Sequence, residues 1–300
     1  IIHKNKFMEK NVFVIIVTFN GDRWIKDTIQ SLLKSKYSCR IVVIDNGSSD
    51  KTLEILSGFK EIKLIDNHLN LGFGQANNIG IEYSQKNNAD FIFLLNQDAK
   101  VEQNTISDLV NVLEKNKDFG IISPLHYNGK GDNYDFNFRK YLDINLEKKN
   151  VNETKFINAA AWMVRSDVFL KYGLFSKEFF HYGEDRNFCD RLNYFKVKIG
   201  ISKNSKIFHD REENASYNKN IVLSRSMLKC SVLNINKNIF ISYFIALTKV
   251  FGLPKYYFKK RRNISDSIFT FFNLLGFYFK LLLLLPNMII ERNKMRVRKK

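Results

Sequence analysis

The sequence predicts an α/β fold with a mostly parallel central sheet, followed by a helical segment at the C-terminal end. Short apolar runs recur along the first 124 residues, and most precede a segment with apolar residues at helical spacing. The runs are nearly continuous in apolar residues, which is typical of strands buried on both faces of a parallel sheet. With 45% hydrophobic residues, the 300-residue chain can bury a large core.

The first half of the chain supplies the predicted strands and helices in alternation. We predict strands over residues 12–18, 40–45, 62–66, 90–98 and 120–124. The predicted helices lie near 22–35, through Leu53 and Leu56, over 74–87 and over 104–116. Ser48, Ser49 or Asp50 can cap the second of these helices.

The second half of the chain has a weaker pattern. Residues 125–155 are polar and aromatic, and we expect a flexible excursion there. The apolar pattern resumes over 156–164, and a helix near 184–196 and a strand near 198–208 follow.

Polar side chains stand where the predicted strands end. They are Thr18, Asn20, Asp45, Asn46, Asp66, Asn67, Asn96, Gln97 and Asp98. Ligands of open parallel sheets bind outside the carboxyl ends of the strands, so these residues predict a polar ligand site. The ordinary polarity of loops would produce part of the same pattern.

Asp98 follows a buried strand, and an unpaired carboxylate is costly to bury. It therefore meets solvent, as a turn or helix-cap residue would, or it binds a cation such as Mg²⁺ or Mn²⁺, which prefer oxygen ligands. His209 ends a later apolar run. A single histidine is usually structural, and this one matters only as a second ligand for the same cation.

Glu184 and Asp185 stand side by side after Gly183, at a predicted helix start. Two carboxylates there can simply stabilise the positive end of the helix dipole. Alternatively, one of them acts as a general base that removes a proton from an attacking hydroxyl.

Several classes of protein are excluded. The glycine-rich stretch 72–80 lacks the third glycine of a dinucleotide fingerprint, and the chain has no P-loop. The cysteines Cys39, Cys189 and Cys230 are widely spaced and form no CxxC pair. This spacing argues against a disulfide framework or a cysteine zinc site, and for a reducing compartment.

Six stretches, in order, resemble the inverting family 2 glycosyltransferases with a GT-A fold, especially the rhamnosyltransferase-like branch. They are VIIVTFN, IVVIDNGSSD, NHLNLGFGQANNIG, FLLNQDAKV, HYGEDRNFCDR and IFH. The resemblance spans about residues 11–217 and does not extend to the last quarter of the chain.

The resemblance implies a role for each matching residue. A nucleotide pocket would be lined by Thr18, Asn20 and Asp45 and shaped by Asn46, Asn70, Gly72, Phe73 and Asn78. Asn96, Gln97 and Asp98 stand at the place of the family's DxD motif, where Asp98 would hold Mg²⁺ or Mn²⁺ with His209 as a further ligand. Asp185 would be the catalytic base and Glu184 would assist acceptor binding. The sugar and acceptor would be flanked by Ala159, Ala160 and Trp162.

One position departs from the family pattern, because the first residue of the tripeptide is Asn96 rather than Asp. Cation binding then depends more heavily on Asp98, and a weak or water-mediated site is an alternative.

The net charge of +18 is concentrated near the C-terminal end. Residues 231–300 carry 14 Lys or Arg against 2 Asp or Glu, which indicates either a Lys-rich composition bias or an anionic partner. The apolar stretch 267–290 lies between basic stretches at 255–262 and 292–300. We favour an interfacial contact with an anionic membrane, because Lys280 is unfavourable at a bilayer centre. A true span and an oligomer or domain-packing surface remain alternatives, whereas this arrangement does not favour nucleic acid.

These observations predict a GT-A domain over 8–230 and a basic, membrane-associating helical region over 231–300. The domain would comprise a nucleotide-sugar half (8–123) and an acceptor half (124–230), and residues 1–7 would precede it.

The expected activity is transfer of a sugar from a nucleotide-diphosphate donor to a saccharide acceptor, which we expect to be lipid-linked. We expect this reaction to serve cell-surface polysaccharide biosynthesis on the cytoplasmic side of the membrane. A non-catalytic membrane-associated assembly protein, a sugar nucleotidyltransferase and a homo-oligomer remain as alternatives.

Overall fold

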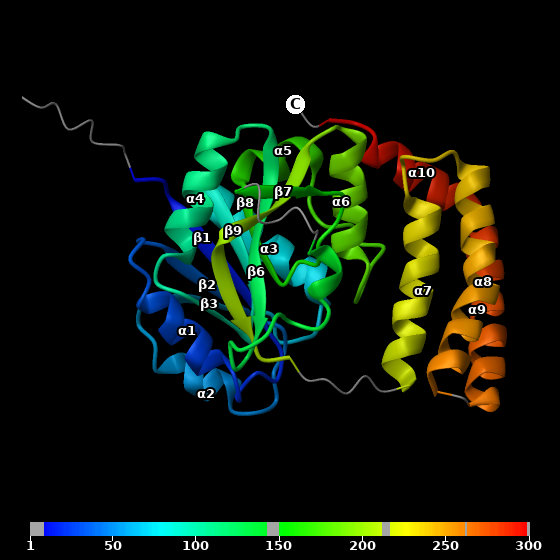
Figure 1. Ribbon diagram of the computed structural model, residues 1–300, viewed down its shortest axis with the longest axis horizontal. Helices are drawn as coiled ribbons and strands as arrows, with labels where there is room; N and C mark the ends of the chain where they lie inside the picture. The colour runs from blue at the N-terminus through cyan, green and yellow to red at the C-terminus, as the bar shows by residue number, and fades with distance from the viewer. Residues whose placement is uncertain (1–8, 143–149, 212–216, 262, 299–300) are drawn as a thin grey trace, which may run out of the picture.

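The computed structural model describes residues 9–142, 150–211, 217–261 and 263–298. A sheet domain and a C-terminal helical unit lie side by side (Figure 1). This arrangement confirms the predicted α/β class with a mostly parallel sheet and C-terminal helices.

In the described part of the chain, nine strands form one sheet in the order β3-β2-β1-β4-β8-β6-β9-β5, with β7 paired to β9. Their bounds are β1 Val12–Thr18, β2 Arg40–Asp45, β3 Ile62–Asp66, β4 Phe91–Asn96, β5 Ala99–Val101, β6 Phe119–Asn128, β7 Val151–Thr154, β8 Ala161–Arg165 and β9 Lys198–His209. β3, β2, β1 and β4 run parallel to one another, and β8 pairs antiparallel with β4. The first three strands match their predicted bounds. The strand predicted over 90–98 is shorter in the structure, because β4 ends at Asn96 and a second strand, β5, begins at Ala99.

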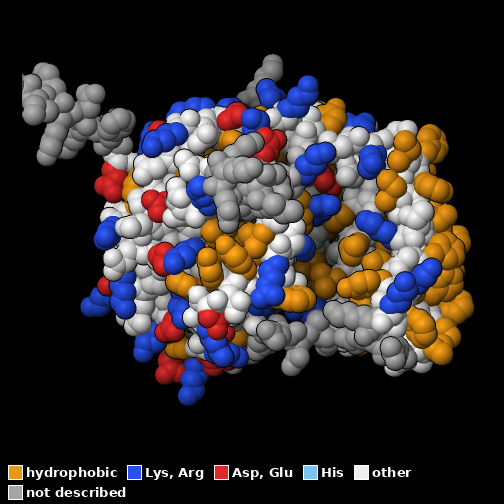
Figure 2. All heavy atoms as spheres, viewed as in Figure 1, with side chains coloured by type: hydrophobic (Ala, Val, Ile, Leu, Met, Phe, Trp, Pro, Cys, Tyr) orange, Lys and Arg blue, Asp and Glu red, His pale blue; other side chains and the backbone are white. Residues whose placement is uncertain are grey.

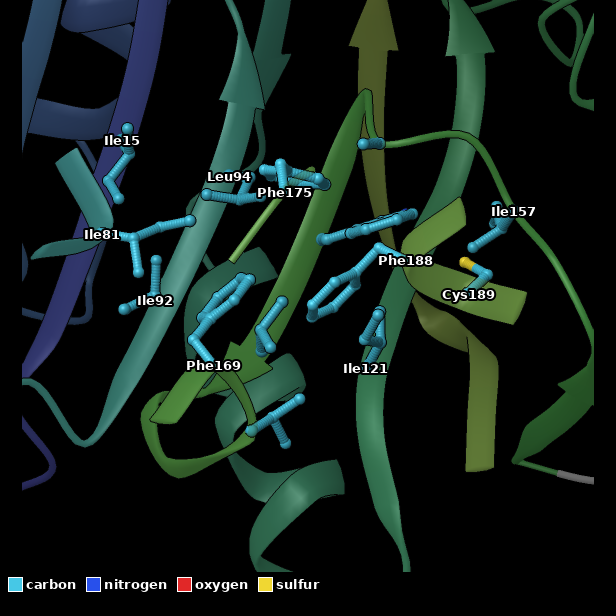
Figure 3. Close-up of a cluster of buried hydrophobic side chains, with 14 of the residues drawn as sticks. Ile15, Ile81, Ile92, Leu94, Ile121, Ile157, Phe169, Phe175, Phe188 and Cys189 are labelled. Atoms are coloured by element: carbon cyan, nitrogen blue, oxygen red, sulfur yellow. The ribbon is translucent and has the colours of Figure 1, made fainter. Parts of the chain in front are cut away.

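Within the described ranges, six α-helices cover the two faces of this sheet. They are α1 Ile25–Leu33, α2 Thr52–Ser57, α3 Phe73–Lys86, α4 Thr105–Lys115, α5 Ser166–Tyr172 and α6 Glu184–Tyr194. Along β1, Phe13 and Ile15 pack with α3, α5 and α6, while Val12, Val14 and Ile16 pack with α1, α2 and α4. Figure 3 shows the first of these layers, where Phe169 and Phe188 lie against the strands. Burial on both faces explains why the predicted strands are continuously apolar.

The segment predicted as a flexible excursion, 125–155, is corrected in two places. β6 continues to Asn128, and β7 pairs antiparallel with β9. The side chains of β7 are only partly buried, so this edge strand lacks the apolar alternation that predicts strands. Residues 143–149 lie outside the described residues. Because β6 crosses residue 123, the expected nucleotide-sugar and acceptor halves share one sheet.

The helical unit consists of α7 Tyr217–Leu233, α8 Ile239–Arg261, α9 Ile264–Leu283 and α10 Leu285–Met295. It has its own core, which includes Leu228, Val232, Tyr243, Leu274 and Met288. The expected boundary at residue 231 falls inside α7. The apolar stretch 267–290 forms most of α9 and the start of α10.

Large apolar side chains cover the outer side of the helical unit (Figure 2). Phe240 and Phe244 of α8, and Phe272 and Leu283 of α9, are between 64% and 84% exposed. Among the described residues, Ile239–Lys259 and Ile264–Leu283 are long and apolar enough to cross a membrane, judged by length and composition alone. The apolar stretch 267–290 singled out in the sequence covers most of the second helix, and the first lies within the same predicted helical region, 231–300.

Candidate active site

The carboxyl ends of β1 and β4 are joined by Gln97. Its side-chain oxygen accepts hydrogen bonds from the Thr18 hydroxyl (2.6 Å) and from the backbone N–H of Phe19 (3.0 Å). The Thr28 hydroxyl of α1 donates to the Gln97 carbonyl at 2.6 Å. Thr18 is fully buried, so in this structure Thr18 and Gln97 hold the two strand ends together, and the chain emerges toward Asp98.

The ends of β2 and β3 form a second group of loops. Both carboxylate oxygens of Asp45 are engaged, one by the N–H groups of Gly47 and Ser48 and the other by the Ser48 hydroxyl. Asn20 accepts a hydrogen bond from the Ser49 N–H, which ties the β1 loop to this turn. Asp45 and Asn20 therefore fix the shape of the rim at which a ligand would be bound.

Hydrogen bonds of asparagine side chains extend the same rim to the start of α3. Asn46 donates to the Asn70 side chain (2.9 Å) and accepts from the Leu71 N–H (3.0 Å), while Asn70 also accepts from the Gly72 N–H. Gly72 has φ +81°, and a Cβ there would lie 1.8 Å from the carbonyl oxygen of Phe180. Only glycine fits this close approach.

Two residues of the expected nucleotide pocket lie in packed positions. The side-chain amide of Asn78 is used at both ends, donating to the Phe175 carbonyl and accepting from the Phe175 N–H, each at 3.0 Å. Phe73 is partly buried and packs against the core. In this structure Asn78 attaches α3 to the chain ahead of α6.

Asp98 and His209 lie together, as the resemblance implies. Asp98 Oδ1 is 3.1 Å from His209 Nε2, and the side-chain amide nitrogen of Asn96 lies 3.5 Å from the same ring atom. The pairing of Ala99 with His209 between β5 and β9 brings them together. Burial raises the pKa of Asp98, but the charges of His209 and Arg211 outweigh that effect and hold the pKa below its ordinary value. Asp98 is therefore ionised at neutral pH.

The far side of the His209 ring faces Asp135, a residue that sequence reasoning missed because it lies in the expected excursion. Asp135 Oδ2 lies 3.5 Å from His209 Nδ1 and 3.3 Å from Arg211 Nε. Its other oxygen accepts the N–H groups of Asn137 and Phe138. Asp135 therefore lies on the Nδ1 side of the ring, and Nε2 lies on the side of Asp98.

Asp98 and His209 fit a divalent cation whose remaining ligands would come from a bound phosphate and water. Among the described residues, no cluster of three or more His, Cys, Asp or Glu side chains could hold a metal by itself. Asp98 and His209 nevertheless place one carboxylate oxygen and one ring nitrogen side by side. Mg²⁺ is commonly held by one or two protein carboxylates together with substrate phosphates and water.

The acid pair lies at the start of α6. Asp185 accepts hydrogen bonds from the N–H groups of Arg186 (2.7 Å) and Ala159 (3.4 Å), whereas a buried oxygen of Glu184 has no hydrogen-bond partner among the described residues. Burial, with the neighbouring Asp185 charge, raises the pKa of Glu184 to about 8, and burial also raises the pKa of Asp185. The pair therefore retains a proton near neutral pH, and Asp185 is a stronger base than an ordinary aspartate.

The loop before β8 links the acid pair Glu184–Asp185 with the strand end that carries Asp98. Ala159 donates its N–H to Asp185, and the neighbouring Ala160 accepts from the N–H of Asn96. Lys140 is electrostatically close to both groups: partial burial and Arg211 lower its pKa, while Asp185 and Asp135 raise it. The charges of Asp185 and of Asp135, which lies beside His209, therefore both act on Lys140, a residue that the sequence did not single out.

Trp162, which the resemblance implies beside the sugar, has a closely packed side chain in this structure, and its expected place beside the sugar stays a prediction. It is fully buried, and its ring centroid lies 6.3 Å from that of Phe175 and 6.2 Å from that of Phe188. β8 is an interior strand between β4 and β6, so its side chains pack into the layers on either face. Trp162 is a residue of the core.

The family model for glycosyl transferase family 2 matches residues 13–173, more than half of the chain. The dTDP-rhamnosyl transferase RfbF of Shigella flexneri is 24% identical over 214 residues, which cover 67% of this chain and 70% of that protein. The rhamnosyltransferase WbbL of Escherichia coli is 23% identical over 209 residues, which cover 63% and 79%.

Solved structures support the fold. The mannosyltransferase PcManGT from Pyrobaculum calidifontis, solved with GDP-Man and Mn²⁺, has a TM-score of 0.64 at 14% identity and covers 97% of this chain and 88% of that chain. The S. aureus TarS fragment solved with UDP-GlcNAc has a TM-score of 0.62 at 16% identity and covers 95% and 89%. With the family model, the sheet order and the loops described above, these likenesses lead to one conclusion: the chain belongs to glycosyl transferase family 2 and has the GT-A fold.

Proposed function

We propose that this glycosyltransferase moves a sugar from a nucleotide-diphosphate donor onto a hydroxyl of a saccharide acceptor, with inversion at the anomeric carbon. The observation that carries the proposal is the acid pair at the start of α6, where burial strengthens Asp185 as a base. The bond from sugar to diphosphate breaks as the bond from acceptor oxygen to sugar forms, and Asp185 takes the hydroxyl proton. A single displacement with one base inverts the centre, whereas a retaining hydrolase would need a second carboxylate about 5 Å away to act as nucleophile.

The donor would lie along the rim formed by the ends of β1, β2 and β4. Asp98 and His209 would hold Mg²⁺ or Mn²⁺, which when bound supplies charge neutralisation for the departing diphosphate. The loops that carry Thr18, Asn46 and Gly72 would surround the nucleotide. Glu184, which keeps its proton, limits the negative charge beside Asp185 and can donate a hydrogen bond to the acceptor.

The acceptor is proposed to be lipid-linked, and the enzyme to act in cell-surface polysaccharide biosynthesis on the cytoplasmic side of the membrane. The support is the exposed apolar side of α8 and α9, combined with exposed Lys255, Lys259 and Lys280. Apolar side chains with lysines near them suit an interface with anionic lipid headgroups.

Asp185→Asn should lower the transfer rate by about 100- to 10,000-fold, because the substituted amide cannot accept the acceptor proton. Donor binding should change little, since the donor rim lies on other loops. Turnover of the sugar nucleotide that best stabilises the protein, chosen by thermal shift from UDP-, dTDP- and GDP-sugars, measures the effect. Asp167→Asn, which alters an exposed carboxylate of α5, is the control, and near-normal turnover in Asp185→Asn would remove Asp185 from the role of base.

Asp98→Ala should weaken Mn²⁺-dependent binding of the same sugar nucleotide, because it removes the carboxylate next to His209. Titration calorimetry with and without MnCl₂ measures the effect. Asp22→Ala, an exposed aspartate near the same rim, should keep wild-type affinity. Equal Mn²⁺ dependence in wild type and Asp98→Ala would contradict the proposed cation site.

Glu184→Gln should flatten the pH dependence of stability between about pH 5 and 8. The folded protein keeps a proton on Glu184 up to about pH 8, whereas an unfolded chain releases it near its ordinary pKa of 4.5. Raising the pH through this window therefore favours the unfolded state. Melting temperatures at pH 5, 6.5 and 8 should fall less in Glu184→Gln than in wild type, and parallel falls in both proteins would argue against the buried proton.

The double variant Phe244→Ser/Phe272→Ser should lose binding to vesicles that contain phosphatidylglycerol, because it removes two large apolar groups from the outer side of the helical unit. Flotation of the full chain measures binding, and Phe136→Ser, an exposed phenylalanine of the sheet domain, is the matched control. If wild type does not float but forms a dimer that the double variant disrupts, the outer side is an interface between copies and the membrane proposal is wrong.

A further inference from the structure

One face of α7 holds the backbone of the segment that leads into the acid pair. Lys229 Nζ donates to the carbonyl of Glu178 at 2.6 Å, and the Ser226 hydroxyl donates to the carbonyl of His181 at 3.2 Å. The Cys230 thiol lies 3.4 Å from the carbonyl of Gly183. Positions three and four apart share one face of a helix, so the three side chains act on the same segment.

The same segment is anchored in the core of the helical unit. Phe179 is 2% exposed and belongs to the cluster that contains Leu228 and Val232. A Cβ on Gly183, which has φ +95°, would lie 2.8 Å from Cys230 Sγ and from an edge carbon of the Phe179 ring. Residues 178–183 therefore belong to the helical unit by their packing, although the sequence places them in the sheet domain.

On its other side, this segment contacts the donor rim. The carbonyl of Phe180 lies against Gly72, at a distance that leaves no room for a Cβ. Residues 178–183 are thus held between α7 and the loop that begins α3. Tyr182 and Gly183 both have positive φ values, 66° and 95°. A left-handed backbone at a non-glycine residue persists only when the surroundings enforce it.

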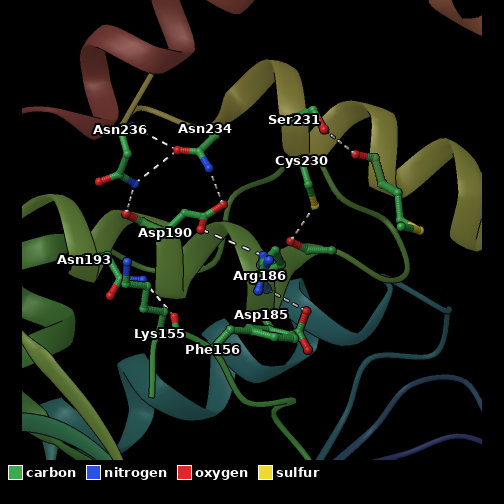
Figure 4. Close-up of polar contacts among 12 residues, drawn as sticks. Lys155, Phe156, Asp185, Arg186, Asp190, Asn193, Cys230, Ser231, Asn234 and Asn236 are labelled. Carbon is green, nitrogen blue, oxygen red and sulfur yellow. Dashed lines mark hydrogen bonds and ion pairs between the residues drawn. The ribbon is translucent and has the colours of Figure 1, made fainter. Parts of the chain in front are cut away.

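α6 starts immediately after this segment, so the segment determines how Glu184 and Asp185 are presented. A second contact fixes α6 further along, where Asp190 accepts from the side chain of Asn234 (3.1 Å) and Asn236 donates to the Asp190 carbonyl (2.7 Å). Figure 4 shows both contacts, with Asp185 at the start of the helix and Cys230 reaching toward the backbone before it. The helical unit therefore holds α6 at two places.

We propose that α7 positions the acid pair for transfer by holding residues 178–183, and that Lys229 is its main positioning residue. The inference rests on the proposed function and extends it, because the helical unit becomes a wall of the active site as well as a membrane contact. Lys229 touches neither substrate nor cation, and it acts through the backbone that precedes Asp185.

The test compares two lysine variants of the full chain. Lys229→Met removes the hydrogen bond to Glu178, and Lys249→Met removes a similar lysine whose Nζ donates to the Met227 carbonyl (3.1 Å) and the Ser231 hydroxyl (2.6 Å), within the helical unit.

We expect Lys229→Met to raise hydrogen exchange of the amides of residues 179–185 about tenfold or more. We expect its kcat to fall by about 10- to 100-fold, since small misplacements of reacting groups are costly. KM for the donor should stay within about threefold, because the Asn46–Asn70 contacts hold the donor rim. Lys249→Met should leave the exchange and kcat near wild type.

Lys229→Arg keeps a donor at the same place and should restore both protection and turnover in large part. Wild-type exchange at residues 179–185 together with wild-type kcat in Lys229→Met would overturn the proposal, as would equal losses in Lys229→Met and Lys249→Met. The exchange measurement does not depend on catalysis. If Asp185→Asn retains activity, the proposed base is wrong, and the exchange measurement still decides whether Lys229 holds the segment.

Discussion

Burial of the central strands on both faces restricts where polar chemistry can occur. β1 and β4 are apolar along nearly their whole length and are enclosed by helices on either side. A charged side chain within them would lose its hydration without gaining a partner. Carboxylates and amides therefore appear where the strands end. Gln97, which follows β4, accepts a hydrogen bond from Thr18 at the end of β1 and so connects the two strand ends. The position of the rim follows from this restriction.

Two acidic groups with different electrostatic surroundings are linked through the backbone of Ala159 and Ala160. Asp98 lies beside His209 and Arg211, which lower its pKa and keep it charged, as a cation ligand must be. Burial raises the pKa values of Glu184 and Asp185, and for Asp185 it outweighs the opposing charge of Arg186. One group is thus suited to hold positive charge and the other to accept a proton. This division of roles between carboxylates is set by their surroundings.

The helical unit has two distinct sides. Its outer side exposes phenylalanines of α8 and α9, whereas its inner side contacts the sheet domain through α7 and the segment before α6. The burial of Phe179 in its core connects the two units more closely than a flexible linker would. The helical unit that exposes this outer side is therefore the same unit that supports the acid pair.

The sequence by itself determined the strands whose signal is local. Residues 12–18, 40–45 and 62–66 form strands at the predicted bounds because each is a short apolar run between turns. The acid pair and the Asp98–His209 pair could be anticipated because their motifs resemble those of a family. β7 could not, since an edge strand need not be apolar.

Only the tertiary structure decided which distant residues became neighbours. Asp135 lies next to His209, Lys229 donates to the carbonyl of Glu178, and Trp162 packs in the core. Each result depends on strand order or on helix packing between residues far apart in the chain. Periodicity and motif spacing contain local information, and the contacts that arrange this site are made over long separations in sequence.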